Sequence, residues 1–506
     1  MLQLDGQSLT LDQVVEVARH KAETAVHPQS RERVSACARV VAQFVKDRKV
    51  VYGITTGFGH FARVNISARH VQELQRNLLM SHASGTGPPI GEDQTRAMML
   101  LRINALIKGY SGIRWSPLER LLYFLNHDIL PVVPQKGSVG ASGDLVPLAH
   151  MSLPLMGMGR VRYRNKTREA GEVLRELGLT PLVLEAKEGL ALINGTQMMS
   201  AVGALNAYDS RILCRTADIA AACSIEALRG TDVPFDARIQ SLRPHPGQAD
   251  AAENIRRLLE ESKILPAHKT CDKIQDAYSL RCLPQVHGAT RDTLDFVETV
   301  LEREINSVTD NPIIFAESQE SLSCGNFHGQ PVALALDYLG IGVAELADIS
   351  ERRIERLVDP ALSNLPPFLT QDGGLNSGYM ITQYTAASLV SENKVLAHPA
   401  SVDSIPTSAN QEDHVSMGTI AAFKGAEIIR NVRQVLAIEL LCAAQGLDFI
   451  REKPGKGVAA AHRMIRRHIP TLTHDRVMAD DLAIMSDLIA REDLLKAVEA
   501  ETGPLS

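Results

Sequence analysis

The sequence predicts an all-α protein built around a long bundle of helices. Three segments have the composition of uninterrupted helices far longer than the usual average of about 11–12 residues, at about 195–229, 328–358 and 414–447. In the second segment, apolar residues recur at alternating spacings of four and three: Val332, Leu336, Leu339, Val343 and Leu346. This spacing makes a seam along which one helix packs against another. Because strand-like segments do not alternate with helical ones, an open parallel sheet is not expected.

Shorter helices are expected before residue 195, and most have a recognisable start or end. After a first amphipathic helix, further helices are expected to begin near Ser30, Ser67, Glu92, Ser116 and Asp144. Serine is a favoured cap residue and proline is favoured in the first helical turn, which Ser116-Pro117 combines. The helices from Ser67, Glu92 and Asp144 are expected to end at about His82, Lys108 and Met156. Pro154 should bend or end the last of these, because proline removes an intrahelical hydrogen bond.

These helices suggest how the chain is organised. We expect residues 1–506 to form a single unit with three parts: a more globular part at 1–195, the central bundle at 196–450 and short helices at 451–506. Long helices that carry apolar residues on several faces usually need partner subunits, so we expect an oligomer.

Composition excludes several classes of protein. The 506 residues carry a net charge of −6, from 53 Lys and Arg against 59 Asp and Glu, which gives no basic footprint for nucleic acid or for a membrane surface. The seven cysteines are scattered and contain no CxxC pair, as in proteins of reducing compartments, and no metal-ligand spacing is found. The N-terminus has neither the basic head nor the apolar core of a signal peptide. We therefore expect a soluble, cytoplasmic protein.

The stretch from Lys136 to Leu145 is the first candidate for chemistry, because it is rich in glycine and serine and lacks bulky residues. In Ala141-Ser142-Gly143, the glycine leaves its amide nitrogen free to attack the Ala141 carbonyl carbon and close a five-membered ring. Loss of water from the ring and from the Ser142 hydroxyl would give a methylidene-imidazolone, an electrophile made from the backbone. The alternatives are a turn in which Ser142 caps the following helix, and a nucleophile elbow. The elbow pattern Gly-x-Ser-x-Gly is broken by Asp144.

Six further segments interrupt the helical pattern with polar residues, which is where binding and catalytic residues concentrate. They are 52–59, 81–85, 188–196, 275–281, 325–329 and 410–414.

The Gly-Ser stretch and three of these segments resemble a known family. Gly-Ser-Val-Gly-Ala-Ser-Gly-Asp-Leu at 137–145, together with Tyr-Gly-Ile-Thr-Thr-Gly-Phe-Gly at 52–59, resembles the aromatic amino-acid ammonia-lyase family, with matching segments from about residue 50 to 450. Ser81-His82 and Asn-Gln-Glu-Asp-His-Val-Ser-Met at 410–417 resemble the members of that family that act on histidine. Ala277 departs from the pattern, because family members often have proline there.

The resemblance implies a fold, an assembly and a reaction. The fold is a mostly helical subunit with a long central bundle of the fumarase and aspartase type, assembled as a homotetramer whose active sites take residues from more than one subunit. The reaction is elimination of ammonia from L-histidine to give trans-urocanate, the first step of histidine degradation. The cofactor is 4-methylidene-imidazol-5-one, formed autocatalytically from Ala141, Ser142 and Gly143, with Ser142 becoming 2,3-didehydroalanine and no external cofactor.

The resemblance also assigns roles to residues, each with a simpler alternative. Tyr52 is the base for the β-proton; free tyrosine has a pKa of about 10, so this role needs positive neighbours or helix N-termini. Tyr278 and Asn194 add hydrogen bonds at the reacting centre and the substrate carboxylate. Arg281 suits that carboxylate because its planar guanidinium donates two hydrogen bonds. Gln275 and Phe327 line the pocket. A loop anchor remains an alternative for Tyr52, a surface ion pair for Arg281 and core packing for Phe327.

His82 and Glu412 are expected to decide the substrate. An imidazole that leaves water needs a donor and an acceptor for its two nitrogens, and a histidine and a carboxylate can supply both. If the resemblance to a family is set aside, the alternative for His82 is a histidine at a helix C-terminus. The alternative for Glu412 is a glutamate in the first turn of a helix, where the helix dipole favours it.

Three other functions stay open. A tyrosine or phenylalanine lyase or aminomutase would keep the electrophile and change the substrate. A lyase of the fumarase and aspartase type would share the long helices without needing the ring. A helical scaffold would use the polar loops only as caps and turns.

Overall fold

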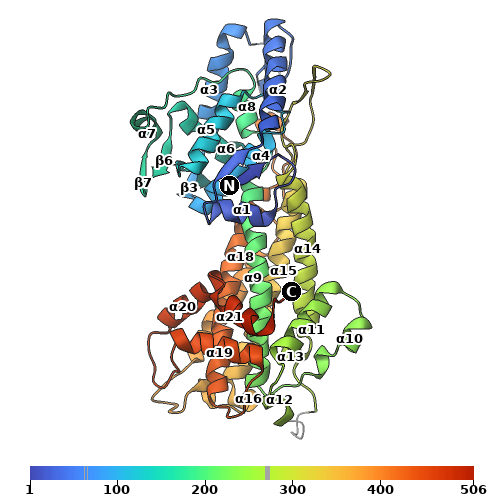
Figure 1. Ribbon diagram of the computed structural model, residues 1–506, viewed down its shortest axis with the longest axis vertical. Coiled ribbons are helices and arrows are strands. Elements are labelled where there is room, and N and C mark those ends of the chain that lie inside the picture. The colour runs from blue at the N-terminus through green and yellow to red at the C-terminus, as the bar shows by residue number, and fades with distance from the viewer. Residues whose placement is uncertain (58, 62, 65, 268–273) are drawn as a thin grey trace. The chain divides into compact units, whose positions relative to one another are not determined.

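The structure is a computed structural model that describes residues 1–57, 59–61, 63–64, 66–267 and 274–506. The chain divides into two compact units. Unit 1 comprises residues 1–208, 298–337 and 399–423, and unit 2 comprises residues 209–297, 338–398 and 424–506. The all-α class is confirmed, since most elements are helices and the strands are two to four residues long (Figure 1).

Four long helices contribute residues to both units: α9 (Gln197–Ala227), α14 (Leu283–Ile305), α15 (Gln330–Val358) and α18 (Gly418–Asp448). Three of them are the long helices that the sequence predicts. The first two predictions agree with α9 and α15 to within two residues at each end. The prediction for the third was wrong at its start by four residues, because Met417 has a φ of 55° and the chain before it runs along another loop.

Unit 1 is organised around one buried helix. Its remaining helices are α1 (Leu11–Ala18), α2 (Pro28–Lys46), α3 (Val71–His82), α4 (Glu92–Leu106), α5 (Trp115–Asn126), α6 (Leu145–Ser152), α7 (Ala170–Glu176) and α8 (Glu188–Ile193). In α4, every residue from Thr95 to Leu106 is buried, so this helix is enclosed on all sides instead of being amphipathic. The polar residues among them, notably Arg102, therefore hold neighbouring segments by hydrogen bonds.

Small sheets complete unit 1, and the sequence reasoning missed them because two- to four-residue strands give no periodicity to read. The strands are β1 (Leu2–Leu4), β2 (Thr24–Val26), β3 (Thr86–Pro89), β4 (Leu130–Pro131), β5 (Pro134–Lys136), β6 (Arg160–Tyr163), β7 (Lys166–Glu169), β8 (Ile313–Phe315) and β9 (Glu320–Leu322). There are four sheets among the described residues. Three are two-stranded, namely β1–β2 (parallel), β3–β5 and β8–β9 (both antiparallel), and the fourth is three-stranded with the order β4-β6-β7.

Unit 1 also contains short turns of 3-10 helix. They are η1 (Gly59–Phe61), η2 (Ala68–His70), η3 (Leu153–Met156) and η6 (Ser408–Asn410), of which η2 and η3 adjoin an α-helix. The helix expected from Ser67 therefore begins with η2, and the helix expected to bend at Pro154 does change there, from α6 into η3.

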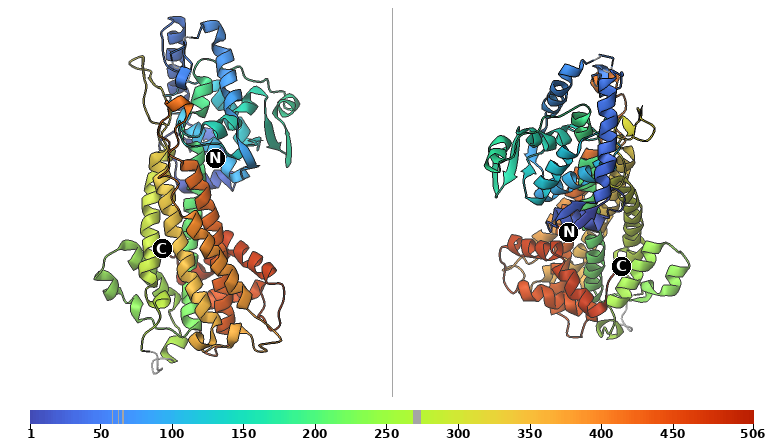
Figure 2. Two further views of the ribbon diagram at one scale, coloured as in Figure 1. Left: turned by 180° about the vertical axis from the view of Figure 1, so that it is seen from behind. Right: turned by 45° about the horizontal axis from the view of Figure 1, so that its top comes forward.

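Unit 2 packs its portions of the four long helices side by side, as Figures 1 and 2 agree. Its other helices are α10 (Ala237–Ser241), α11 (Pro246–Leu258), α12 (Ile264–Ala267), α13 (Tyr278–Arg281), α16 (Pro360–Ser363), α17 (Met380–Leu396), α19 (Lys456–His468), α20 (Met478–Ala490) and α21 (Asp493–Thr502), with 3-10 turns η4 (Val233–Phe235) and η5 (Pro367–Leu369).

Buried charges connect these helices. Arg353 of α15 forms a two-bond ion pair with Glu439 of α18, and both side chains are fully buried. Ser224 of α9 and Ser350 donate to the same carboxylate at 2.7 and 2.6 Å, so both oxygens of Glu439 are satisfied. A second buried carboxylate, Glu226, accepts from the backbone N–H of Gly455, and its burial raises its pKa to about 7.

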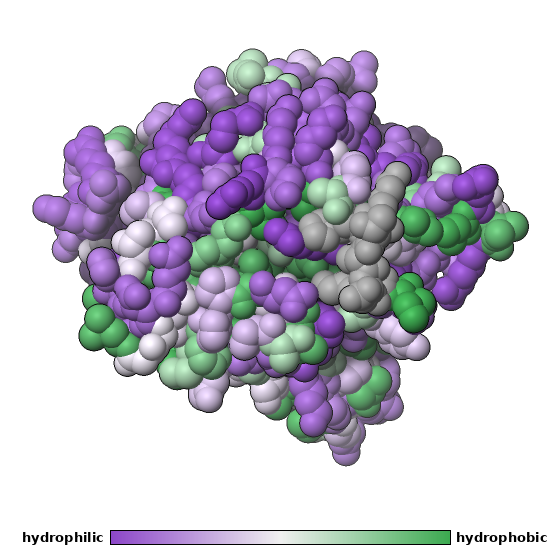
Figure 3. Space-filling view, turned by 90° about the horizontal axis from the view of Figure 1, so that it is seen from below, coloured by the Kyte–Doolittle hydropathy of each residue, from purple (hydrophilic) through white to green (hydrophobic). Residues whose placement is uncertain are grey.

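No helix among the described residues combines the length and the apolar composition needed to cross a bilayer. On the face shown in Figure 3, hydrophilic side chains predominate and hydrophobic ones occur in small separate groups.

Candidate active site

The Gly-Ser loop at 137–144 folds in a way that only glycine permits at two positions. Gly140 and Gly143 have φ angles of 66° and 70°. A methyl group on Gly143 would collide with the carbonyl of Gly195, and one on Gly140 would collide with the Ser416 hydroxyl. The Asp144 N–H donates to the Gly195 carbonyl at 2.7 Å. The loop is therefore held closely against two other loops of unit 1.

Asp144 is the buried anchor of this loop. Its carboxylate accepts four hydrogen bonds, from the Ser138 hydroxyl at 2.9 Å, the Thr419 hydroxyl, and the backbone N–H groups of Met198 and Met199, both at 2.9 Å. Those N–H groups belong to the first turn of α9, where a negative charge is favoured by the helix dipole. Burial raises the pKa of Asp144, although its four donors act in the opposite direction. One side chain thus fixes the loop, the start of α9 and the start of α18.

Ser142 faces Glu412. The half-buried Ser142 hydroxyl donates to Oε1 of Glu412 at 3.2 Å, and no side chain caps α6. The interpretation of Ser142 as a helix cap is therefore wrong. The interpretation of Glu412 as a first-turn glutamate is wrong as well, because α18 begins only at Gly418.

The segment that carries Glu412 runs along the Gly-Ser loop. Met417 N–H donates to the Val139 carbonyl at 2.9 Å, and the Ser416 hydroxyl donates to the Gly140 carbonyl at 3.1 Å. Ala141 packs with Val415 and Met417 in a small apolar cluster. These contacts hold the segment outside the helix, and α18 begins only at Gly418.

His82 lies under the electrostatic influence of Glu412. It is the last residue of α3, half-buried, with Nδ1 3.1 Å from the Ser81 hydroxyl. Burial lowers its pKa, and the negative charge of Glu412 acts in the opposite direction. The neutral imidazole that burial favours can offer one donor and one acceptor.

Asn194 is buried, and within the described part of the chain the nitrogen of its side-chain amide is hydrogen-bonded whereas the oxygen is not. Its Nδ2 donates to the Asn311 carbonyl at 2.9 Å, whereas Oδ1 accepts no hydrogen bond from any residue that the structure describes. Its turn is held by Arg102, which donates from the core of α4 to the carbonyls of Ala191 and, at 3.3 Å, Thr309. An amide oxygen held in this way is suited to accept from an N–H of a ligand.

Tyr52 and Phe327 lie on two further loops of unit 1. The half-buried Tyr52 hydroxyl accepts from the Gly59 N–H at 3.3 Å; Phe58 of the same motif lies outside the described residues. Phe327 is half-buried beside His328, whose ring stacks on that of His414 with centroids 5.7 Å apart. Nδ1 of His328 accepts from the Gln330 N–H, so Nε2 carries the proton and donates to the His414 carbonyl at 3.2 Å.

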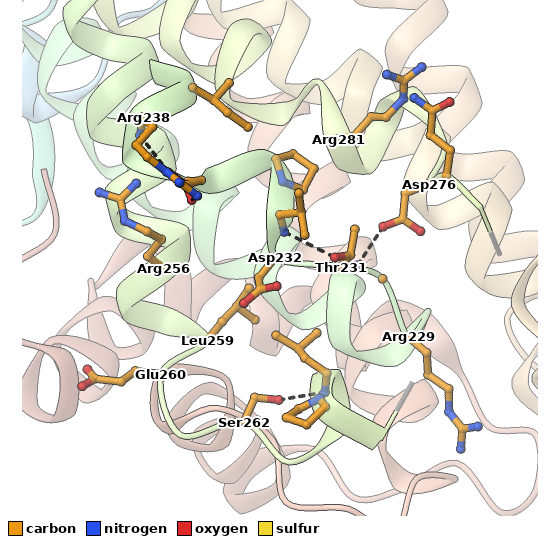
Figure 4. A pocket seen from close by; sticks show the side chains of 18 of the residues that line it. Arg229, Thr231, Asp232, Arg238, Arg256, Leu259, Glu260, Ser262, Asp276 and Arg281 are labelled. Atoms are coloured by element: carbon orange, nitrogen blue, oxygen red, sulfur yellow. Dashed lines mark hydrogen bonds and ion pairs between the residues drawn. The ribbon is translucent and has the colours of Figure 1, made fainter. Parts of the chain in front are cut away.

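The other three predicted residues belong to unit 2. The guanidinium of Arg281 lies 4.5 Å from the ring centroid of Tyr278, which is 71% exposed. The Gln275 amide oxygen, in the orientation that satisfies its hydrogen bonds, accepts from Arg281 at 2.7–3.2 Å. Gln275 and Arg281 also line a cavity of about 1190 Å³ within unit 2. Figure 4 shows Arg281 on one side of this cavity and Arg238 and Arg256 on the other.

Unit 1 therefore brings most of its predicted residues to one segment, 407–417. Ser142 donates a hydrogen bond to Glu412, the charge of Glu412 acts on the pKa of His82, and the loop of Phe327 is joined to His414. Sequence reasoning missed Thr407, Thr419 and the anchoring role of Asp144. Asp144 belongs to the motif at 137–145. The sequence does not indicate that the Thr419 hydroxyl bonds to Asp144, or that the Thr407 hydroxyl bonds to Glu412.

In this mostly helical chain a glycine-bounded serine loop is fixed at the start of two long helices. A family model described as aromatic amino acid lyase matches residues 9–467, which places the chain among the lyases. The chain belongs to the aromatic amino acid lyase family, so the family expected from the motifs is confirmed.

Relatives match over nearly their whole length. Histidine ammonia-lyase of Symbiobacterium thermophilum is 57% identical over 501 residues, with 99% of each chain covered, and that of Alkaliphilus oremlandii is 54% identical, with 98% of each covered. Among solved structures, histidine ammonia-lyase from Trypanosoma cruzi is 44% identical with a TM-score of 0.92, covering 99% of this chain and 95% of that one. A tyrosine aminomutase from Streptomyces globisporus is 38% identical with a TM-score of 0.95, and both chains are covered fully.

Proposed function

We propose that this chain, acting as a single lyase unit, eliminates ammonia from L-histidine to give trans-urocanate. The observation that carries the proposal is the placement of Glu412 beside Ser142 and within electrostatic reach of His82. A carboxylate and a neutral imidazole can together satisfy both nitrogens of a substrate imidazole, whereas an apolar pocket would not compensate the loss of water. Relatives that are 57% and 54% identical and carry the name histidine ammonia-lyase support the same substrate.

The residues at 141–143 fit the ring cofactor of this family. Gly143 has a φ of 70° and no room for a side chain, and Ala141 is buried in an apolar cluster. Asp144 and Gly195 hold the following backbone in place. When formed, 4-methylidene-imidazol-5-one supplies an electrophile that turns the amino group of the substrate into a better leaving group. The condensation consumes the Ser142 hydroxyl, which leaves Oε1 of Glu412 available to a ligand.

The other predicted residues receive these roles in the proposal. Arg281, oriented by Gln275, binds the substrate carboxylate, because its planar guanidinium can make two parallel hydrogen bonds. Asn194 accepts from a substrate N–H through Oδ1, since Nδ2 is already committed to Asn311. Tyr52 takes the β-proton and Tyr278 assists at the reacting centre, while Phe327 lines the pocket.

We further propose a homotetramer in the cytoplasm. Unit 2 exposes apolar side chains on its long helices: Phe296 is 52%, Tyr338 46% and Ile341 42% exposed. Such a face on a helix of this length is suited to a second copy of the chain. Cys37 and Cys223 are buried thiols, which agrees with a reducing compartment.

A tyrosine aminomutase or lyase is the second candidate, because a tyrosine aminomutase shares the fold at 38% identity. Turnover of L-histidine, L-tyrosine and L-phenylalanine by the purified protein separates the two. Histidine turnover alone supports the proposal, and preference for tyrosine or phenylalanine contradicts it.

Two variants test the chemistry. The ring form is lighter than the encoded chain by two water molecules, so intact mass measures the condensation directly. Ser142→Ala should abolish both the mass deficit and turnover, and a fully active Ser142→Ala protein would defeat the proposal. Glu412→Gln should keep the mass deficit and lower kcat/KM for histidine.

A further inference from the structure

Thr407 and Glu412 close a short turn. The residues that come directly after this turn, up to Met417, pack along the Gly-Ser loop. Thr407 N–H donates to the Glu412 carbonyl at 2.9 Å, and Glu412 N–H donates to the Thr407 carbonyl at 3.3 Å. In an antiparallel pair that exchanges both hydrogen bonds, the two side chains project from the same face. The backbone therefore places the threonine hydroxyl beside the carboxylate.

The two oxygens of Glu412 have different partners. The Thr407 hydroxyl donates to Oε2 at 2.8 Å, while Oε1 accepts from the Ser142 hydroxyl at 3.2 Å. The Thr407 partner is supplied by the same turn, and the Ser142 partner comes from 270 residues away in the sequence. One oxygen is thus held locally, and the other is directed at the Gly-Ser loop.

The turn between them is strained and fixed. Ser408, Ala409 and Asn410 have φ angles of 51°, 53° and 65°, in the left-handed region, which costs roughly 1–2 kcal/mol for each residue with a side chain. Such a conformation persists only where the surroundings impose it, and strained segments concentrate at functional sites. Here the 407–412 pair closes the turn on one side, and Gly59 lies so close that a methyl group on it would be 2.5 Å from the Ser408 hydroxyl oxygen.

We propose that Thr407 is a positioning residue that sets the orientation of the Glu412 carboxylate toward the imidazole of the substrate. The proposal rests on the proposed function, in which Glu412 binds that imidazole. The Thr407 hydroxyl fixes Oε2, so that Oε1 keeps its direction once Ser142 no longer offers a hydroxyl. Without Thr407, the carboxylate would be free to rotate among side-chain conformers and would lose a hydrogen bond to a charged group.

The first test compares Thr407→Val, which keeps the shape and removes the hydroxyl, with Thr407→Ser, which keeps the hydroxyl. Thr167→Val, exposed on the β6–β7 hairpin, is the matched control for the chemical change. Thr407→Val should raise KM for L-histidine and lower kcat/KM by about 10- to 100-fold, the range for one hydrogen bond to a charged group. Thr407→Ser should restore kcat/KM to within about threefold, as judged by that scale. All three should retain the mass deficit of two waters and bind trans-urocanate in the same order as their histidine KM values.

The second test places Thr407→Val in a Glu412→Gln background. If Thr407 acts through the carboxylate, the second change should add less than about threefold, because coupled residues are not additive. Additive losses, wild-type kinetics in Thr407→Val, or loss of the mass deficit in that variant would each overturn the role of Thr407. Wild-type histidine turnover in Glu412→Gln would instead overturn the proposed function of Glu412, so the two failures are distinguishable.

Discussion

Replacing Asp144 with alanine should strongly destabilise unit 1, because this carboxylate is the acceptor for four donors. The N–H groups of Met198 and Met199 donate to Asp144 from the first turn of α9, where a helix supplies no acceptor of its own. Leaving them buried without the carboxylate costs about 1–3 kcal/mol each. Loss of the negative charge at that helix N-terminus adds about 0.3–2 kcal/mol. Removing the carboxylate costs less free energy at the hydroxyls of Ser138 and Thr419, because they lie 3.1 Å apart and are hydrogen-bonded to each other. The total is about 2–8 kcal/mol, a large part of the roughly 5–15 kcal/mol that stabilises a typical protein.

The informative control is Asp144→Asn. Its amide oxygen can still accept from the two N–H groups and its NH₂ can donate to a hydroxyl, so the expected cost is only about 1–2 kcal/mol, the difference between charged and neutral hydrogen bonds. Urea-induced unfolding followed by circular dichroism measures both variants, and intact mass reports ring formation in each. An alanine variant within about 1 kcal/mol of the wild type, or an asparagine variant that is equally damaging, would refute this account of the loop.

Three further changes test other features. Gly143→Ala should prevent ring formation, seen as loss of the mass deficit, because its methyl group would collide with the Gly195 carbonyl; a variant with the full deficit would contradict the close packing. Arg353→Met should cost about 3–5 kcal/mol in urea unfolding by leaving Glu439 charged and unpaired, and adding Glu439→Leu should recover much of this loss. Burial raises the pKa of Glu226 to about 7, so the folded state retains a proton that the unfolded chain releases above pH ~4.3; wild-type stability from this group is present below that pH and is lost as the pH rises to about 7. The Tm of Glu226→Gln relative to wild type should therefore increase between pH 5 and 8, and a constant difference would exclude this linkage.

The sequence was sufficient for the long helices, because their length and apolar seams are local properties. It placed α9 and α15 to within two residues. It failed at the start of α18, where helix-compatible residues at 414–417 are held outside the helix by hydrogen bonds to the loop at 139–140. Here tertiary contacts outweigh local helix propensity, and a local sequence pattern does not reveal such contacts.

The candidate site divides in the same way. Motifs identified Ser142, His82 and Glu412 as residue types suited to the chemistry, and the structure adds that Glu412 contacts Ser142 and influences His82. Thr407 could not be found from the sequence, since a single threonine in a polar loop carries no signal. Its importance follows only from the backbone pairing that places it beside Glu412.

The contacts of the Gly-Ser loop also set the order of events during synthesis. Gly140 and Asp144 depend on Ser416 and Thr419, which lie 276 and 275 positions later in the chain. A ribosome releases the earlier stretch long before the later one, so the nascent loop lacks the neighbours that would bend it for condensation. The reactive group should therefore form only on nearly complete chains. Prematurely terminated chains should keep an unmodified Ser142, so incomplete products would not carry the electrophile.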